Sequence, residues 1–142
     1  MIMELFPFDN LIVGILVIIV GFVFHFIGQL ISIVNWEFAQ KLGLQEKNAL
    51  KEHKVYEHAI AAADVAIGWI YGIVGIGLIL DVSWAYYIAL IPGTVFIYHS
   101  IFYWVMQGNH KKSGMPLVNN LTRIVWFLLN FITGILVILI AL

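Results

Sequence analysis

The sequence predicts an all-α integral membrane protein, a four-helix bundle that forms a single transmembrane domain over residues 1–142. Of the 142 residues, 63% are hydrophobic and 11% are charged, a composition too apolar for an ordinary soluble domain. The apolar residues gather in four runs, each with the roughly 20 residues that a helix needs to cross about 30 Å of hydrocarbon. Most charged residues lie between these runs or near their ends.

The first two predicted spans cover about residues 11–36 and 56–80. No Lys or Arg precedes the first run, and it is longer than the apolar part of a signal peptide, so we expect it to be a permanent span. The second run carries its ionisable residues in its first half. The first span is interrupted by the polar residues His25, Gln29 and Asn35, and the second carries Glu57, His58 and Asp64.

The third and fourth predicted spans cover about residues 84–106 and 117–142. The second and third spans are joined by only a few residues, which makes these two helices antiparallel neighbours. Each of the later spans again includes polar side chains. They are His99 and Tyr103 in the third span and Arg123 and Asn130 in the fourth.

The charges predict how the chain crosses the membrane. All seven basic residues lie in the connections at residues 37–55 and 107–116, or within about two turns of them. The charged residues on the opposite side of the membrane are all acidic. By the positive-inside rule both connections are cytoplasmic. We therefore expect a multi-pass protein of the cell (inner) membrane with the N- and C-termini outside.

Three spans bring an ionisable side chain to a similar depth. Counted inward from the cytoplasmic ends at about 1.5 Å per residue, His25, Asp64 and His99 lie roughly 10 to 17 Å deep. An ionised carboxylate near mid-membrane costs about 2.5 to 3.5 kcal/mol. Asp64 is therefore expected to be protonated, paired or metal-bound.

Polar residues also recur at helical spacing, which gives each span one polar stripe. Four such stripes that face one another predict a polar pocket open to the cytoplasm, with apolar side chains toward lipid. Beyond the ionisable residues, the expected pocket-lining residues are Gln29, Tyr103, Arg123 and Asn130.

The residue types in this pocket suit a divalent metal ion. Carboxylate with imidazole is a ligand set for Zn, Fe or Mn, and four-helix bundles build metal sites from inward-facing carboxylates and histidines. The candidate ligands are Asp64, His99, Glu57, His25 and His58, although adjacent residues on a helix point about 100° apart. Whether the protein is an enzyme stays open; if it is, Glu57 is the candidate general base for metal-assisted chemistry on a lipid or small amphiphile.

Other functions remain open beside the metal site. Asp64 and His99 could relay protons in a proton-linked or small-solute transporter or channel subunit, with Arg123 as a counter-charge. His25 and His99 could hold a b-type haem from two helices. The protein could also be a structural subunit of a larger membrane complex. In that case these polar groups only form hydrogen bonds between helices, each of which stabilises the bundle by about 0.6 kcal/mol.

Part of the second and third spans resembles a group of known membrane proteins. The stretch from Tyr56-Glu57-His58-Ala59 through Asp64-Val65-Ala66-Ile67-Gly68, followed by His99 in the next span, is similar to small bacterial four-helix membrane proteins of the DoxX-like or uncharacterised type. The resemblance covers the second and third spans and implies a four-helix bundle. Similar proteins with a redox role usually carry cysteines or depend on a partner, and this chain has no cysteine.

The expected partners follow from the apolar surface. Four helices around a polar centre have little apolar core of their own, so besides the lipid bilayer we expect a homo-oligomer or a partner membrane subunit, and no nucleic acid. Within the chain, Gly68 and Gly72 form a small-residue pattern that is typical of a helix-packing face.

Overall fold

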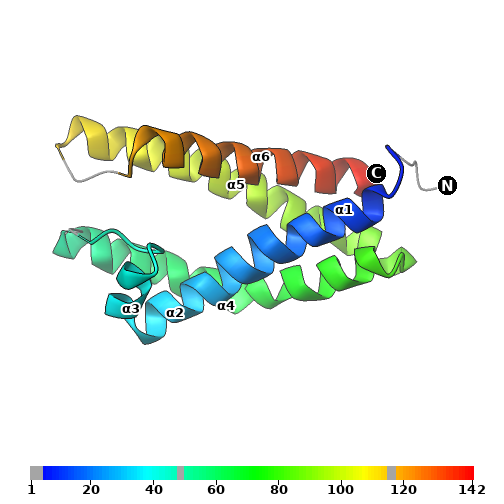
Figure 1. Cartoon of the computed structure of the whole chain (residues 1–142), viewed down its shortest axis with the longest axis horizontal. Helices are drawn as coiled ribbons and strands as arrows, with labels where there is room; N and C mark the ends of the chain where they lie inside the picture. Colours follow the sequence, from blue (N-terminus) through cyan, green and yellow to red (C-terminus); the bar gives the residue numbers. More distant parts are fainter. Residues whose placement is uncertain (1–4, 48–49, 115–117) are drawn as a thin grey trace.

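The computed structural model describes residues 5–47, 50–114 and 118–142, which form helices and short connections with no strand among them. Among these residues, four helical segments are long and apolar enough to cross a membrane, and Figure 1 shows them as antiparallel rods in one bundle. The all-α four-helix fold is confirmed, and the chain has the architecture of a multi-pass membrane protein. The four segments are Asp9–Val34, Lys51–Ile79, Ser83–Lys112 and Asn120–Ala141.

The first segment changes its hydrogen-bonding register twice. It starts as helix α1 (Asp9–Leu16), continues as the π-helix η1 (Val17–Gly28) and ends as α2 (Gln29–Val34). π-Helical turns are rare and often lie at functional sites. Here the π-helical stretch contains His25.

A short helix follows the first segment. Asn35 has extended backbone geometry, and its side-chain oxygen accepts a hydrogen bond of 3.0 Å from the backbone N–H of Phe38. This N-cap starts α3 (Trp36–Lys41). The polar stretch after the first predicted span is thus partly helical.

The remaining segments are helices α4 (Lys51–Ile79), α5 (Ser83–Lys112) and α6 (Asn120–Ala141). Helix α4 begins before the apolar run expected at residue 56, and α5 continues beyond the run that ends at residue 106. Hydropathy marks the part of a helix that suits lipid, whereas the backbone hydrogen bonds continue into the polar flanks. The expected start of the fourth span at residue 117 lies outside the described residues.

The connection between α4 and α5 is a tight turn. Asp81 adopts a left-handed backbone with φ of 54°, and the hydroxyl of Tyr86 donates a 2.6 Å hydrogen bond to its carboxylate. The backbone N–H of Val82 donates to the carbonyl of Gly77 at 2.9 Å. Helices α4 and α5 are therefore antiparallel neighbours, as the short connection predicted.

Glycines allow the closest helix contacts. A Cβ atom on Gly68 or Gly72 of α4 would lie 2.9 Å from side-chain carbons of Phe26 and Phe22, respectively, on the π-helical stretch. Helices α5 and α6 meet in the same way, because a Cβ on Gly134 would lie 2.9 Å from the carbonyl oxygen of Gly93. The bundle is thus built from two close pairs, the first segment with α4 and α5 with α6.

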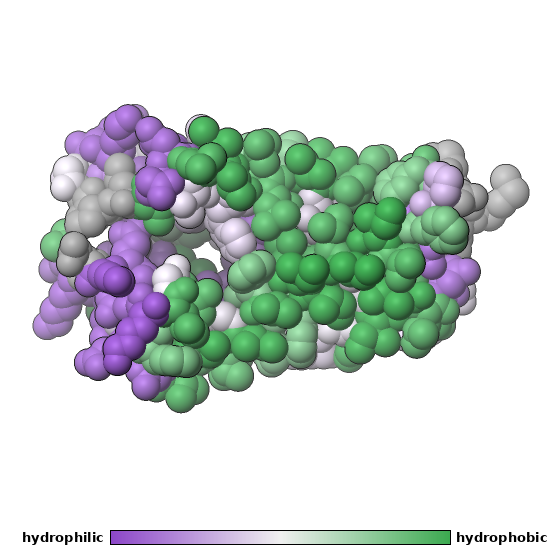
Figure 2. All heavy atoms as spheres, in the orientation of Figure 1, coloured by the Kyte–Doolittle hydropathy of each residue, from purple (hydrophilic) through white to green (hydrophobic). Residues whose placement is uncertain are grey.

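The two ends of the bundle differ in polarity. The start of α1 and the end of α6 lie at one end, and α3 with the longer connections lies at the other (Figure 1). Figure 2 shows a broad apolar surface between them, with the larger group of hydrophilic residues at the end with α3. The interior toward the termini is closed by fully buried apolar side chains, which include Val13, Val17, Val20, Val74, Leu78, Phe96 and Val137.

Candidate functional site

Three helices place an ionisable side chain at one point inside the bundle. His25 from η1, Asp64 from α4 and His99 from α5 each offer one ligand atom, and these atoms lie within 4.8 Å of one another. His25 and Asp64 are 4% and 5% exposed, and the side chain of His99 is 11% exposed. The residues that the sequence placed at one depth therefore meet in space, and we call them the inner cluster.

The carboxylate of Asp64 is surrounded by nitrogen atoms. Nε2 of His99 lies 2.9 Å from Oδ1, and the side-chain amide of Gln29 donates a long hydrogen bond of 3.4 Å to Oδ2. Nδ1 of His25 lies 3.9 Å from Oδ2. Buried charges persist only when they are paired and hydrogen-bonded, and His99 and Gln29 supply the hydrogen bonds to this carboxylate.

The fourth helix fixes the orientation of His25. The amide nitrogen of Asn130 donates to the backbone carbonyl of Trp126 at 2.9 Å, which leaves its oxygen to face the ring of His25. That oxygen lies 2.7 Å from Nε2 of His25, so the ring nitrogen donates the proton. Asn130 is fully buried. All four membrane-spanning segments therefore contribute to this layer.

This hydrogen bond determines what His25 presents to Asp64. A neutral imidazole carries one proton, and here Nε2 holds it, so Nδ1 has only a lone pair. The lone pair faces the carboxylate oxygen of Asp64 across 3.9 Å. Two acceptors that face each other in a buried place repel each other, and a metal ion bound to both would remove that repulsion.

Aromatic rings enclose the inner cluster on the side of the termini. The ring of His25 lies 6.0 Å from that of Tyr71 and 5.9 Å from that of Phe96, measured between centroids. Tyr71 and Phe96 stack on each other at 4.9 Å, and the ring of Trp126 lies 5.4 Å from His25. Together with the apolar core beyond them, Tyr71 and Phe96 separate the cluster from the end of the bundle that holds the termini.

In the described part of the chain, the buried polar atoms that lack a hydrogen-bond partner lie on the other side of the inner cluster. Five buried side-chain atoms have no hydrogen-bond partner among the residues that the structure describes. All five belong to residues between the cluster and the end with the connections. They are Gln29 Oε1, His53 Nδ1, Gln107 Oε1, His110 Nδ1 and Arg123 Nε.

The other predicted site residues lie outside the inner cluster. Glu57 faces the bundle interior on α4, about two turns from Asp64, whereas its neighbour His58 is exposed. Tyr103 is half-buried on α5. Arg123 donates to the carbonyl of Trp104 at 2.9 Å, and its guanidinium lies 4.0 Å from the centre of that indole ring.

Sequence reasoning missed two polar residues near the connections. His53 and His110 are at most partly exposed, although they lie in segments that hydropathy gave as connections. The i, i+4 spacing of His53 and Glu57 was the available signal, because such residues share a helix face.

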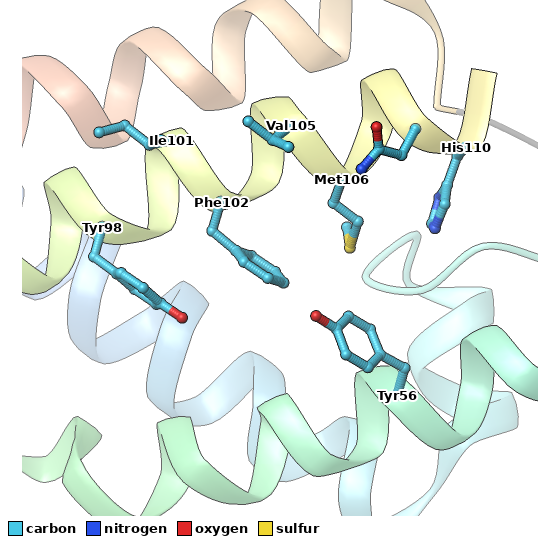
Figure 3. Close-up of a pocket in the computed structure, with 8 residues that line it drawn as sticks. Tyr56, Tyr98, Ile101, Phe102, Val105, Met106 and His110 are labelled. Carbon is cyan, nitrogen blue, oxygen red and sulfur yellow. The ribbon is translucent and has the colours of Figure 1, made fainter. Parts of the chain in front are cut away.

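A groove of about 490 Å³ opens between α4 and α5 near the same end. Figure 3 shows Tyr56 of α4 facing Phe102 and Met106 of α5, with His110 at one end of the row. Tyr98 at the other end is 62% exposed. The lining is mostly apolar and does not include the inner cluster, so the groove lies beside the cluster and reaches the polar end through His110.

Comparison of the chain with protein-family models, with curated proteins and with solved structures gives no match. The DoxX-like resemblance stays a prediction.

Proposed function

We propose that this chain is a multi-pass membrane protein that binds a divalent transition-metal ion, with His25, Asp64 and His99 as ligands. The observation that carries the proposal is that Nδ1 of His25 and Oδ2 of Asp64 face each other, each with a free lone pair. Asn130 holds His25 in this orientation through the hydrogen bond to Nε2. A metal ion would neutralise the carboxylate and use both lone pairs at once.

The ligand set fits this class of ion. Two imidazoles and one carboxylate are the protein ligands of many Zn and non-haem Fe sites that keep an open position. Histidine ligands nearly always donate their second N–H to a carbonyl or carboxylate, the role that Asn130 has for His25. Binding requires His99 to give up the Nε2 proton directed at Asp64 and the three ligand atoms to draw closer together.

A proton-linked transporter or channel subunit is the second candidate. The 2.9 Å contact between His99 and Asp64 favours it, because a proton can move between these groups. The stacked rings of Tyr71 and Phe96 oppose a through-path in this conformation. Transport would therefore need a second conformation in which these rings move apart.

The arrangement does not support a b-type haem between His25 and His99. The centroids of the two rings lie 4.6 Å apart. A macrocycle ligated on both faces has to lie between the imidazoles, and this distance leaves no space for it.

The proposal also includes the orientation of the chain in the membrane and the partners of its apolar surface. We place the connections in the cytoplasm of a cell with the protein in its inner membrane, because the basic residues gather there. Large apolar side chains are exposed on all four long segments. They would meet lipid and, on part of the surface, a second copy or a partner subunit.

The experiment is a titration of detergent-purified protein with Co²⁺, whose visible absorption reports imidazole and carboxylate ligation. Wild-type protein should saturate at about one ion per chain, and Asp64→Asn or His99→Ala should abolish the spectrum. His58→Ala is the matched control, because that histidine is exposed. Circular dichroism checks that each variant folds.

Two results would contradict metal binding. One is a folded wild-type protein with no Co²⁺ spectrum, and the other is an unchanged spectrum in Asp64→Asn. In the first case flux in liposomes decides between the other candidates, because Asp64→Asn should stop proton-linked transport and leave a structural subunit unaffected.

A further inference from the structure

We infer that His53, Glu57 and His110 form an outer cation site that takes up the divalent ion at the end with the connections and passes it to the inner cluster. This inference rests on the proposed metal binding and deepens it, because it assigns a loading route. Neither His53 nor His110 has a role in the inner cluster.

Two helices bring the outer site together. His53 lies in the first turn of α4 and is only 8% exposed, and its Nε2 lies 4.0 Å from Oε1 of Glu57 one turn later. The ring of His110 from the last turns of α5 meets the ring of His53 at a centroid distance of 4.8 Å. The set of two imidazoles and one carboxylate repeats the composition of the inner cluster.

The outer site has unused ligand atoms. Nδ1 of His53 and Nδ1 of His110 are buried without a hydrogen-bond partner among the described residues. A buried polar atom left without a partner costs about 1 to 3 kcal/mol. A cation bound by these nitrogens would remove that cost, and Glu57 would balance its charge.

The outer site and the inner cluster lie in series along α4. Glu57 is one turn from His53, about 6 Å along the helix, and Asp64 follows about 10 Å further in. Gln29 lies next to Asp64, because its amide nitrogen donates a hydrogen bond to that carboxylate. Its amide oxygen has no hydrogen-bond partner in the described part of the chain and could contact a passing ion. The oxygen of Gln107 is buried and unpartnered as well, one turn from His110.

The outer site is suited to transfer and not to storage. The neighbouring Lys51, Lys111 and Lys112 are exposed, and their positive charges repel a bound cation. His110 also lines the end of the groove between α4 and α5 (Figure 3), which gives the site an opening. An ion held weakly here can move on to the tighter inner ligands.

The test measures loading rate and equilibrium binding separately. Stopped-flow absorbance follows Co²⁺ entry into wild-type protein, a His53→Ala/His110→Ala double variant and the exposed control His58→Ala. We expect loading of the double variant to slow by about tenfold or more, because loss of groups that support a metal site costs about 10- to 100-fold and the variant lacks two of the three side chains that would hold the incoming ion. The final spectrum and the equilibrium affinity should match wild type. Glu57→Gln, which keeps the side-chain size, should also slow loading.

The outcomes separate the two claims. Equal loading rates in wild type, the double variant and Glu57→Gln would overturn the outer site, and so would loss of the equilibrium spectrum in a folded double variant. Absence of any Co²⁺ spectrum in wild type would instead overturn the proposed metal binding itself.

Discussion

Asn130 shows how a single residue can set the chemistry of its neighbour. Its amide donates to the carbonyl of Trp126 and accepts from His25, so the protonated nitrogen of His25 points away from Asp64. Without this acceptor the imidazole could place its proton on either nitrogen. The lone pair would then no longer be held ready for a cation.

This role predicts a specific loss in Asn130→Leu. A residue that accepts a hydrogen bond from a metal-binding histidine is worth about 10- to 100-fold in metal affinity, so Co²⁺ should bind that much more weakly in a protein that still folds. Asn130→Asp keeps an acceptor and should retain most of the affinity, and the exposed Asn109→Ala serves as control. Titration against a competing chelator measures all three, and equal affinity in Asn130→Leu would contradict the role.

Sequence alone placed His25, Asp64 and His99 at one depth, because helical rise fixes depth. It could not pair His25 with Asn130, since the rotation of each helix about its axis depends on how neighbouring helices pack. His53 and His110 escaped notice for another reason. They lie beyond the apolar runs, and hydropathy does not reveal that α4 and α5 extend to include them.

At the level of helices, close packing depends on glycines whose neighbours cannot move. A Cβ on Gly134 would press against the backbone oxygen of Gly93 at 2.9 Å, whereas a Cβ on Gly108 would meet only the flexible guanidinium of Arg123 at 3.4 Å. The small-residue pattern on α4 indicated such packing from sequence. The π-helical register of η1 was not predictable, because residue hydropathy carries no information on backbone hydrogen bonds.

The two glycines give a matched pair of variants. Gly134→Ala should destabilise the protein by about 1 to 3 kcal/mol through overpacking between α5 and α6. Gly108→Ala should be neutral or slightly stabilising, since alanine favours helix by about 1 kcal/mol over glycine. Thermal unfolding in detergent measures both. A Gly134→Ala protein as stable as Gly108→Ala would show that this helix contact is not as close as described.

On the scale of the whole molecule, the bundle has a closed half and a polar half. The start of α1 and the end of α6 share the closed end (Figure 1). The inner cluster lies where the fully buried apolar side chains give way to polar ones. The sequence predicted this division well, because charge placement and hydropathy act on whole segments. A cation should therefore reach the cluster from the end with the connections.

Metal binding by this site should depend on pH. Histidine and carboxylate ligands must be deprotonated to bind a metal, so protons and the metal compete for the same lone pairs. Co²⁺ affinity should fall as the pH is lowered from neutral and rise as the pH increases. Titrations at several pH values measure this, and an affinity that stays constant into the acid range would contradict imidazole ligation.

Membrane orientation can be tested with single cysteines, because the chain has none of its own. Lys112→Cys should react with a membrane-impermeant thiol reagent only after the membrane is opened, and Leu142→Cys should react in intact cells. Both native side chains are exposed, so access is not limited by the fold. The reverse labelling pattern would place the polar half outside the cell.

The most direct test of the central claim is the metal content of detergent-purified protein after dialysis, measured by elemental mass spectrometry for wild type and His99→Ala. We predict about one Zn, Fe or Mn ion per wild-type chain and none in the variant. A folded, metal-free wild-type protein, or equal metal in both proteins, would contradict a metal site at His25, Asp64 and His99.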